Sequence, residues 1–189
     1  MPRHAHDQLT AHQRRIVREL EELASLLRLD YQDIQSYERE ARLPLLERMR
    51  RQFILGEVIS RYTLVDEYLN MRIAHYFFGR DRSFIHLWKT KKFKLFNWHV
   101  IEELSLMAKL RFAKSISPLP KAVAADVERL NSLRNGLAHA FFPENLKKSR
   151  PEWKGKNIFT LEGLRLFMAD MDKIGDYFLD VPQDAGAHL

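Results

Sequence analysis

The sequence predicts an all-α fold, and three observations support this. Glycine and proline occur only 7 times each in 189 residues, which is too few for the many tight turns of an all-β protein. Leucine, glutamate, arginine and alanine, which favour helices, are abundant. Apolar residues recur every three or four positions through several long segments. Because 46% of the residues are hydrophobic, the chain can bury a core, and we expect one main domain.

An extra amphipathic helix is predicted near the N-terminus, over Leu9–Leu29, where leucine and isoleucine recur at helical spacing opposite charged pairs. Pro44 suits the first turn of the next helix, because its missing N–H is not needed there. This second helix is predicted to run from Leu45 to Phe78, with Gly79 ending it and Gly56 as a point of interruption. Its expected buried stripe comprises Met49, Phe53, Ile59, Tyr62, Val65, Leu69, Ile73 and Phe77.

The segment "RDRSFIHLWKTKKFKLFN" is expected to be a basic, aromatic connector. Asn97 at its end is predicted to cap a third helix, whose apolar positions are Val100, Leu104, Met107 and Leu110. Two prolines in "SISPLPK" end this helix, since neither fits inside it. The next helix is predicted to begin near Lys121 and to reach at least Asn135.

A polar loop, "LKKSRPEWKGKN", is expected before the last helix, for which Thr160 is the predicted N-cap. The buried stripe of that helix is predicted to be Leu161, Leu164, Met168, Met171, Ile174 and Phe178. These elements divide the chain into an N-terminal helical extension over residues 1–43, a helical domain over 44–180 and a flexible tail over 181–189.

The charge balance of the chain favours polyanions. Lysine and arginine exceed aspartate and glutamate by 31 to 25, giving a net charge of +6 and an isoelectric point near 9.6. This indicates either affinity for RNA or simply a solvated basic surface. The chain has no cysteine, and no secretion signal follows "MPRHAHDQLT", so we expect a cytoplasmic location. No apolar stretch approaches the ~20 residues of a membrane-spanning helix, and we expect no membrane partner.

The stretch "LNSLRNGLAHAFF" places polar side chains beside an apolar stripe. On an ideal helix its leucines and Phe141 share one face, whereas Asn135 and His139 lie on the opposite side. Arg134 flanks the stripe, and its long side chain can reach the polar side. Asparagine and glycine have low helix propensity, so the presence of Asn135 and Gly136 inside this helix indicates that they are there for a functional reason. The alternative is a solvated histidine and an arginine whose stem covers the core.

The motif "RNGLAH", Arg134 to His139, resembles the RxxxxH signature of HEPN domains. The segments "ISRYTLVDEYLNMRIAHYF" and "LEGLRLFMADMDKIGDYF" are similar to the second and closing helices of that family. The resemblance implies a HEPN-like helical bundle that forms a homodimer, with the two motifs lining a shared cleft. It also implies a metal-independent endoribonuclease that leaves 2′,3′-cyclic phosphate ends and needs no cofactor. Such enzymes occur as toxins of toxin–antitoxin and phage-defence systems, so an antitoxin protein is a further expected partner.

The resemblance assigns catalytic roles to three residues. Arg134 would bind the scissile phosphate through its bidentate guanidinium group, and Asn135 would orient the histidine or the phosphate. His139 would act as acid or base, because imidazole titrates near neutral pH. Other members of the family have lost catalysis, so the alternative is a non-catalytic module that binds a nucleotide, RNA or a protein.

Further candidate binding residues lie outside the motif. The segment "WKTKKFKLF" combines aromatic residues with Lys89, Lys91, Lys92 and Lys94, as in surfaces that bind single-stranded RNA, although a basic loop anchored in the core would show the same pattern. His4, His6 and His12 are expected to be incidental rather than metal ligands. Asp66 and Glu67 are expected to be surface charges, one of which could pair with Arg134. No metal site and no cofactor are expected.

Overall fold

The computed structural model describes residues 38–79, 84–139 and 151–180, together with Ala11 and Arg15. The predicted N-terminal helix over Leu9–Leu29 and the tail over 181–189 lie outside these residues. The chain divides into two compact units, residues 1–50 and 51–189, and the elements below belong to the second unit except for residues 39–50. The domain boundaries expected from the sequence stay predictions.

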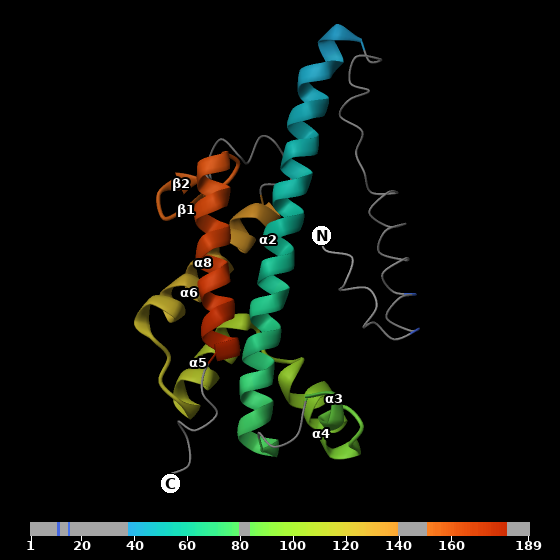
Figure 1. Cartoon of the computed structure of the whole chain (residues 1–189), viewed down its shortest axis with the longest axis vertical. Coiled ribbons are helices and arrows are strands. Elements are labelled where there is room, and N and C mark those ends of the chain that lie inside the picture. Colours follow the sequence, from blue (N-terminus) through green and yellow to red (C-terminus); the bar gives the residue numbers. More distant parts are fainter. Residues whose placement is uncertain (1–10, 12–14, 16–37, 80–83, 140–150, 181–189) are drawn as a thin grey trace. The chain divides into compact units, whose positions relative to one another are not determined.

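The described residues are mostly helical, which confirms the all-α class. They form six α-helices, one π-helical turn and two short strands. In chain order these are α2 (Arg39–Phe78), α3 (Phe84–Leu87), α4 (Lys91–Phe96), η3 (Asn97–Ile101), α5 (Leu106–Ile116), α6 (Lys121–His139), β1 (Glu152–Trp153), β2 (Lys156–Asn157) and α8 (Leu161–Asp180). Figure 1 shows their arrangement.

The long helix α2 begins earlier than predicted. It starts at Arg39, so Pro44 lies inside it and not in its first turn. The missing N–H of Pro44 therefore leaves the carbonyl of Glu40 without its usual helical donor. The helix continues through Gly56 without interruption and ends at Phe78, just before Gly79, whose φ of 82° suits glycine.

The buried face of α2 is rotated from the predicted stripe. Val65, Leu69 and Ile73 are buried as expected, but the stripe continues upstream through Val58 and Ile54. The predicted core positions Phe53, Ile59 and Phe77 are exposed. The prediction was wrong there because Phe53 and Ile59 each lie one residue from a buried position, which on a helix turns the side chain by about 100°.

The segment expected to be a connector forms helices α3 and α4, and the next helix begins later than predicted. Ser105 caps α5, because its Oγ accepts from the backbone N–H of Ala108 at 3.3 Å. Asn97 instead begins the π-helical turn, where its side chain is buried and donates to Glu102 Oε1 at 3.1 Å. The predicted role of Asn97 as the N-cap of this helix was therefore wrong; Asn97 is the C-cap of α4, and Val100 is exposed.

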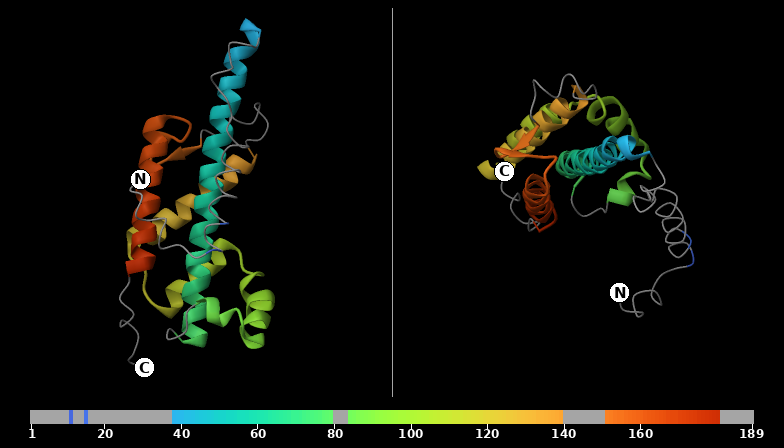
Figure 2. Two further views of the ribbon diagram at one scale, coloured as in Figure 1. Left: turned by 45° about the vertical axis from the view of Figure 1, so that its right-hand side comes forward. Right: turned by 90° about the horizontal axis from the view of Figure 1, so that it is seen from above.

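Two separate clusters of buried side chains hold the unit together. The main cluster joins α2, α5, α6, α8 and the hairpin. The smaller cluster joins the end of α2 to the α3–α4 region through Ile73, Ala74, Leu87, Phe93 and Ile101. Figures 1 and 2 show α2 and α8 side by side. The two helices run parallel, because Arg61 pairs with Asp172 and, further along both helices, Tyr68 stacks on Phe178.

The expected polar loop before the last helix contains a β-hairpin. Strands β1 and β2 pair in antiparallel register, and the turn between them places Lys154 and Gly155 at φ of 47° and 80°. Trp153 is fully buried, edge-on to Phe167 of α8 with 5.2 Å between the ring centroids. A loop anchored by a buried tryptophan was not predicted, because its polar neighbours dominate the local sequence.

An ionic network ties this hairpin to α6 and α8. Lys154 Nζ lies 2.7 Å from Asp170 of α8 and 3.0 Å from Asp126 of α6. Trp153 Nε1 donates to Asp170 at 2.9 Å, and Lys173 lies 3.0 Å from the same carboxylate. Burial by itself would raise the pKa of Asp170, but the hydrogen bonds from Lys154, Trp153 and Lys173 outweigh it and lower this pKa from 3.8 to about 2.

The lowered pKa of Asp170 predicts an acid-sensitive contribution to stability. Folding favours the ionised carboxylate, so the contribution is complete above about pH 4 and is lost as the pH falls towards 2. The lowering corresponds to about 2 kcal/mol. The gap in unfolding free energy between the wild type and Asp170→Asn should therefore narrow over this range. The control Asp176→Asn lies at an exposed position of the same helix, and its unfolding free energy should differ little from that of the wild type across this pH range. If the difference for Asp170→Asn is also independent of pH, the prediction is wrong.

Gly163, in the first turn of α8, predicts a glycine-specific packing requirement. Thr160 caps this helix as predicted, accepting from the N–H of Gly163 at 3.1 Å. A Cβ at Gly163 would lie 2.0 Å from the carbonyl oxygen of Asn157, so Gly163→Ala should destabilise the protein by about 1–3 kcal/mol in urea denaturation. In Gly175→Ala, on the same helix, the Cβ meets only Tyr68 at 3.5 Å, and it should be neutral or stabilising. If Gly163→Ala and Gly175→Ala change the free energy of unfolding equally, the predicted clash with Asn157 does not occur.

Candidate functional site

Helix α6 presents Arg134 and Asn135 of the predicted motif on its exposed side. Leu130, Leu133 and Leu137 are buried in the main cluster, as the sequence predicted. Arg134 and Asn135 are exposed, and Arg134 Nη1 donates to Asn135 Oδ1 at 3.3 Å. The arginine and the asparagine of the motif therefore lie together, with the guanidinium accessible to an anion.

The guanidinium of Arg134 lies over the aromatic ring of Tyr62 on α2. The Arg134 Cζ atom lies 5.4 Å from the centroid of the Tyr62 ring, which is a cation–π contact. Burial raises the pKa of the Tyr62 phenol; the positive charge of Arg134 opposes this effect, and the negative charge of Asp66 adds to it. The sequence placed Tyr62 in the core stripe, and its contact with Arg134 depends on how α2 and α6 pack, which helical periodicity does not encode.

His139 is the last residue of α6. The structure describes its backbone position on the motif helix, four residues beyond Asn135. Its side chain lies outside the described residues, as does Phe141. Whether His139 meets Arg134 and Asn135 therefore stays a prediction.

Asp66 does not pair with Arg134. Its Oδ2 accepts from Lys109 Nζ at 2.7 Å and from Asn70 Nδ2 at 3.3 Å. Lys109 is a buried residue on α5, so this pair joins α2 to α5. Among the described side chains, none with a carboxylate forms an ion pair with Arg134, which leaves its charge available to a ligand.

The four lysines predicted to bind RNA are all exposed, at the start of α4 and just before it. Thr90 caps α4 by accepting from the N–H of Phe93 at 3.3 Å. Two aromatic residues of this segment face the core, because Phe93 is fully buried and Phe96 packs on Phe77 and Phe78. The segment is thus anchored by aromatic residues while its lysines reach solvent, and RNA binding by these lysines stays a prediction. The lysines and the motif are separate features on different helices.

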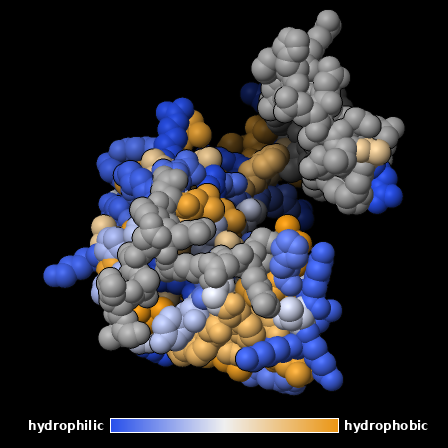
Figure 3. Space-filling model, turned by 60° about the horizontal axis from the view of Figure 1, so that its bottom comes forward, coloured by the Kyte–Doolittle hydropathy of each residue, from blue (hydrophilic) through white to orange (hydrophobic). Residues whose placement is uncertain are grey.

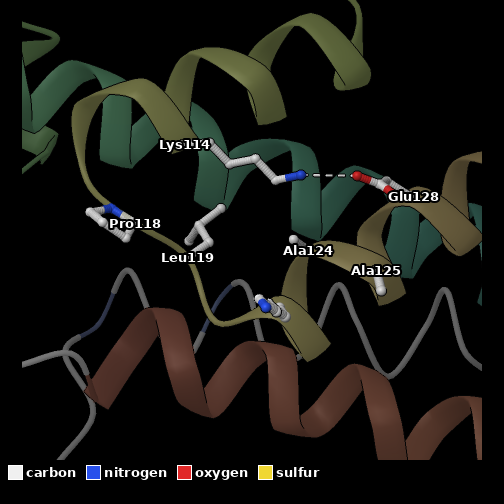
Figure 4. A pocket seen from close by; sticks show the side chains of 7 residues that line it. Lys114, Pro118, Leu119, Ala124, Ala125 and Glu128 are labelled. Carbon is white, nitrogen blue, oxygen red and sulfur yellow. Dashed lines mark hydrogen bonds and ion pairs between the residues drawn. The ribbon is translucent and has the colours of Figure 1, made fainter.

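A pocket of about 380 Å³ lies beside the start of α6, away from Arg134 near the end of that helix. Lys114 spans it to reach Glu128 Oε1 at 2.9 Å (Figure 4). Its remaining lining residues are Pro118, Leu119, Lys121, Ala124 and Ala125. No residue predicted from the sequence to be functional lines this pocket.

Comparison with protein-family models, characterised proteins and solved structures finds no match to this chain. The HEPN resemblance therefore rests on the motif and on the helical context alone. Within residues 38–79, 84–139 and 151–180, no three metal-ligating side chains group together, and no helix is long and apolar enough to cross a membrane. His4, His6 and His12 lie outside the described residues.

Proposed function

We propose that this chain is a metal-independent endoribonuclease of the HEPN type. The observation that carries the proposal is the exposed Arg134–Asn135 pair, supported by the Tyr62 ring, on the helix that ends at His139. A guanidinium over an aromatic ring keeps N–H groups free for a phosphate, since Asn135 accepts from Nη1 alone, and a pair of such N–H groups matches two phosphate oxygens. In this proposal the enzyme works in the cytoplasm, as the toxin of a toxin–antitoxin or phage-defence system.

The proposed reaction uses the RNA itself as the nucleophile. A base removes the proton of the 2′-OH, which attacks the adjacent phosphorus, while an acid protonates the departing 5′-oxygen. Arg134 stabilises the charge that develops on the phosphorane oxygens, and His139 transfers protons. One histidine per motif supplies one of these two proton transfers, so the complete site needs a second His139.

We therefore propose a homodimer that brings two copies of α6 together around one cleft. The exposed side of α6, which carries Arg134 and Asn135, is available for this contact, and a two-fold axis is the commonest symmetry of a dimer. Light scattering at micromolar concentration should give twice the chain mass of 22.5 kDa. If the measured mass is that of a single chain, the proposed site shared by two chains does not form.

Cleavage of a broad panel of RNAs in EDTA tests the proposed function. The expected products carry 2′,3′-cyclic phosphate ends, which polynucleotide kinase with phosphatase activity can reveal. Toxicity on expression that His139→Ala relieves would add support. If all RNAs remain intact at high enzyme concentration, the ribonuclease assignment is wrong.

Tyr62 provides a further prediction, because its ring rather than its hydroxyl contacts Arg134. Tyr62→Phe should bind an uncleavable 2′-O-methyl RNA as the wild type does, whereas Tyr62→Leu should bind it about 2- to 5-fold more weakly, as expected for a partly exposed cation–π contact. The matched control is Tyr76→Leu, at an exposed tyrosine on the same helix. Equal loss in Tyr62→Phe and Tyr62→Leu would show that the ring contact is not what matters.

A second candidate function is a non-catalytic module that binds a nucleotide, RNA or a protein partner through Arg134. The observation that favours it is the pairing of Asp66 with Lys109 and Asn70. This carboxylate, one turn along α2 from Tyr62, is thereby committed to the contact between α2 and α5, so it does not supply the second acid–base group that catalysis requires. RNA or nucleotide binding that depends on Arg134, without any cleavage, would identify this alternative.

A further inference from the structure

The α3–α4 region carries large apolar side chains on its surface, among lysines. Ile85 is 73% exposed, Leu95 49% and Trp98 63%. We call these three residues, together with Trp88, Lys91 and Lys94, the Lys–Trp surface. Figure 3 looks towards the end of the unit where α3 and α4 lie, and its lower part shows hydrophobic surface bordered by hydrophilic side chains. Exposed apolar groups gathered in this way mark an interaction surface.

The packing of α4 fixes this orientation. Phe93, Asn97 and Ile101, spaced four residues apart, are buried, and Phe93 lies edge-on to the rings of Trp88 and Phe78, at 5.2 and 5.4 Å. Residues 91, 95 and 98 follow the opposite side of the same turns. Leu95 and Trp98 therefore cannot turn inwards unless Phe93 leaves the core.

The charge of the region selects an anionic partner. The sequence contains no aspartate or glutamate from residue 84 to residue 101. None of the lysines 89, 91, 92 and 94 forms an ion pair with another described side chain; Lys92 lies over the Phe78 ring at 5.8 Å. A second copy of the chain would set lysines against lysines, which disfavours self-association through this surface.

The apolar groups discriminate between anionic partners. Single-stranded RNA would stack on aromatic faces, but Phe93 is buried and Phe96 packs on Phe77 and Phe78. Only Trp98 and the less exposed Trp88 offer such a face, whereas Leu95 and Ile85 add aliphatic surface that bases do not use. The most exposed group, Ile85, has no ring on which a base can stack. A lipid bilayer accepts all three kinds of side chain, because aliphatic groups enter the acyl boundary, tryptophans lie at the headgroups and lysines attract anionic lipids.

We propose that the Lys–Trp surface docks on anionic lipid bilayers. This inference goes beyond the proposed ribonuclease function and does not depend on it. The expectation of no membrane partner considered only spanning segments, whereas a contact from one side requires no spanning helix. Binding is reversible and depends on salt, because the charged part of the attraction is screened.

Co-sedimentation of the full chain with vesicles tests the proposal. The chain should pellet with vesicles that contain phosphatidylglycerol and remain soluble with phosphatidylcholine alone. Lys91→Glu/Lys94→Glu should weaken binding at least about 25-fold, at roughly fivefold per lysine. The matched control Lys121→Glu/Arg165→Glu makes the same charge change at exposed positions on α6 and α8 and should lower binding clearly less.

Tryptophan fluorescence gives a second readout. The chain has three tryptophans, and Trp153 is already fully buried, so a blue shift on adding anionic vesicles reports on Trp88 and Trp98. Trp98→Phe should reduce this shift while the protein stays folded. The proposal is wrong if the wild type does not bind anionic vesicles or if both double variants lose binding equally. It is also wrong if Lys91 and Lys94 are needed to bind oligouridylate while vesicles are not bound.

Discussion

Replacing Arg134 by alanine is expected to lower the rate of RNA cleavage about 10²–10³-fold, since one preorganised donor to the phosphorane is removed. Replacing His139 by alanine should lower it about 10²–10⁴-fold, as expected for the loss of a general acid or base. Arg134→Lys should recover little, because an ammonium group lacks the planar pair of donors that faces two phosphate oxygens. Single-turnover cleavage of a labelled RNA measures each rate.

The controls for this prediction separate chemistry from folding and charge. Arg111→Ala removes an exposed arginine from the neighbouring helix α5 and should cleave at the wild-type rate. Unchanged thermal unfolding of Arg134→Ala, whose side chain is exposed, would show that the loss is local. If Arg134→Ala and Arg111→Ala cleave equally well, Arg134 has no catalytic role.

Replacing Trp153 by alanine is expected to destabilise the protein by about 3–5 kcal/mol, which is a large share of the stability of a typical domain. The indole is fully buried against Phe167, and its Nε1 donates to Asp170 at 2.9 Å. Trp153→Phe retains a ring beside Phe167 and loses only the donor and some volume, so it should cost about 1–3 kcal/mol. Urea denaturation monitored by circular dichroism gives both values.

Trp98→Ala is the matched control for this prediction. Its side chain is 63% exposed, so its removal should change the unfolding free energy by no more than about 0.5 kcal/mol. Similar losses in Trp153→Ala and Trp98→Ala would mean that the hairpin is not part of the core. Equal stability of Trp153→Phe and the wild type would mean that the hydrogen bond to Asp170 adds nothing.

The helices with strong sequence signals were predicted well. Helix α6 begins at Lys121, and α8 follows Thr160, whose hydroxyl caps it. Both signals are local, because a cap or a proline acts within one turn of the helix. In α8 the predicted core residues Met171 and Ile174 are buried, but Leu161 is exposed. The prediction failed at Leu161 because the first turn of the helix projects beyond the core.

Features that depend on contacts distant in sequence were missed. The hairpin around Lys154 is stabilised by Asp126 and Asp170, which lie 28 and 16 residues away. The contact of Tyr62 with Arg134 joins residues on two different helices. Asn97 was taken for a cap because its residue type favours caps, yet Ser105 has that role. In the candidate site the sequence predicted that α6 presents Arg134 and Asn135, but not the ring that supports them.

The smaller cluster of buried side chains, which includes Phe93, joins the α3–α4 region to the end of α2 and is distinct from the main cluster. Segments held by different cores open in different cooperative steps, and the step with fewer buried groups has the lower free energy. Backbone amides of α4 should therefore exchange with solvent through local opening, whereas amides of α6 near Leu130 exchange only when the main cluster unfolds. The helix that carries Arg134 is thus rigid on a timescale on which the Lys–Trp surface can rearrange.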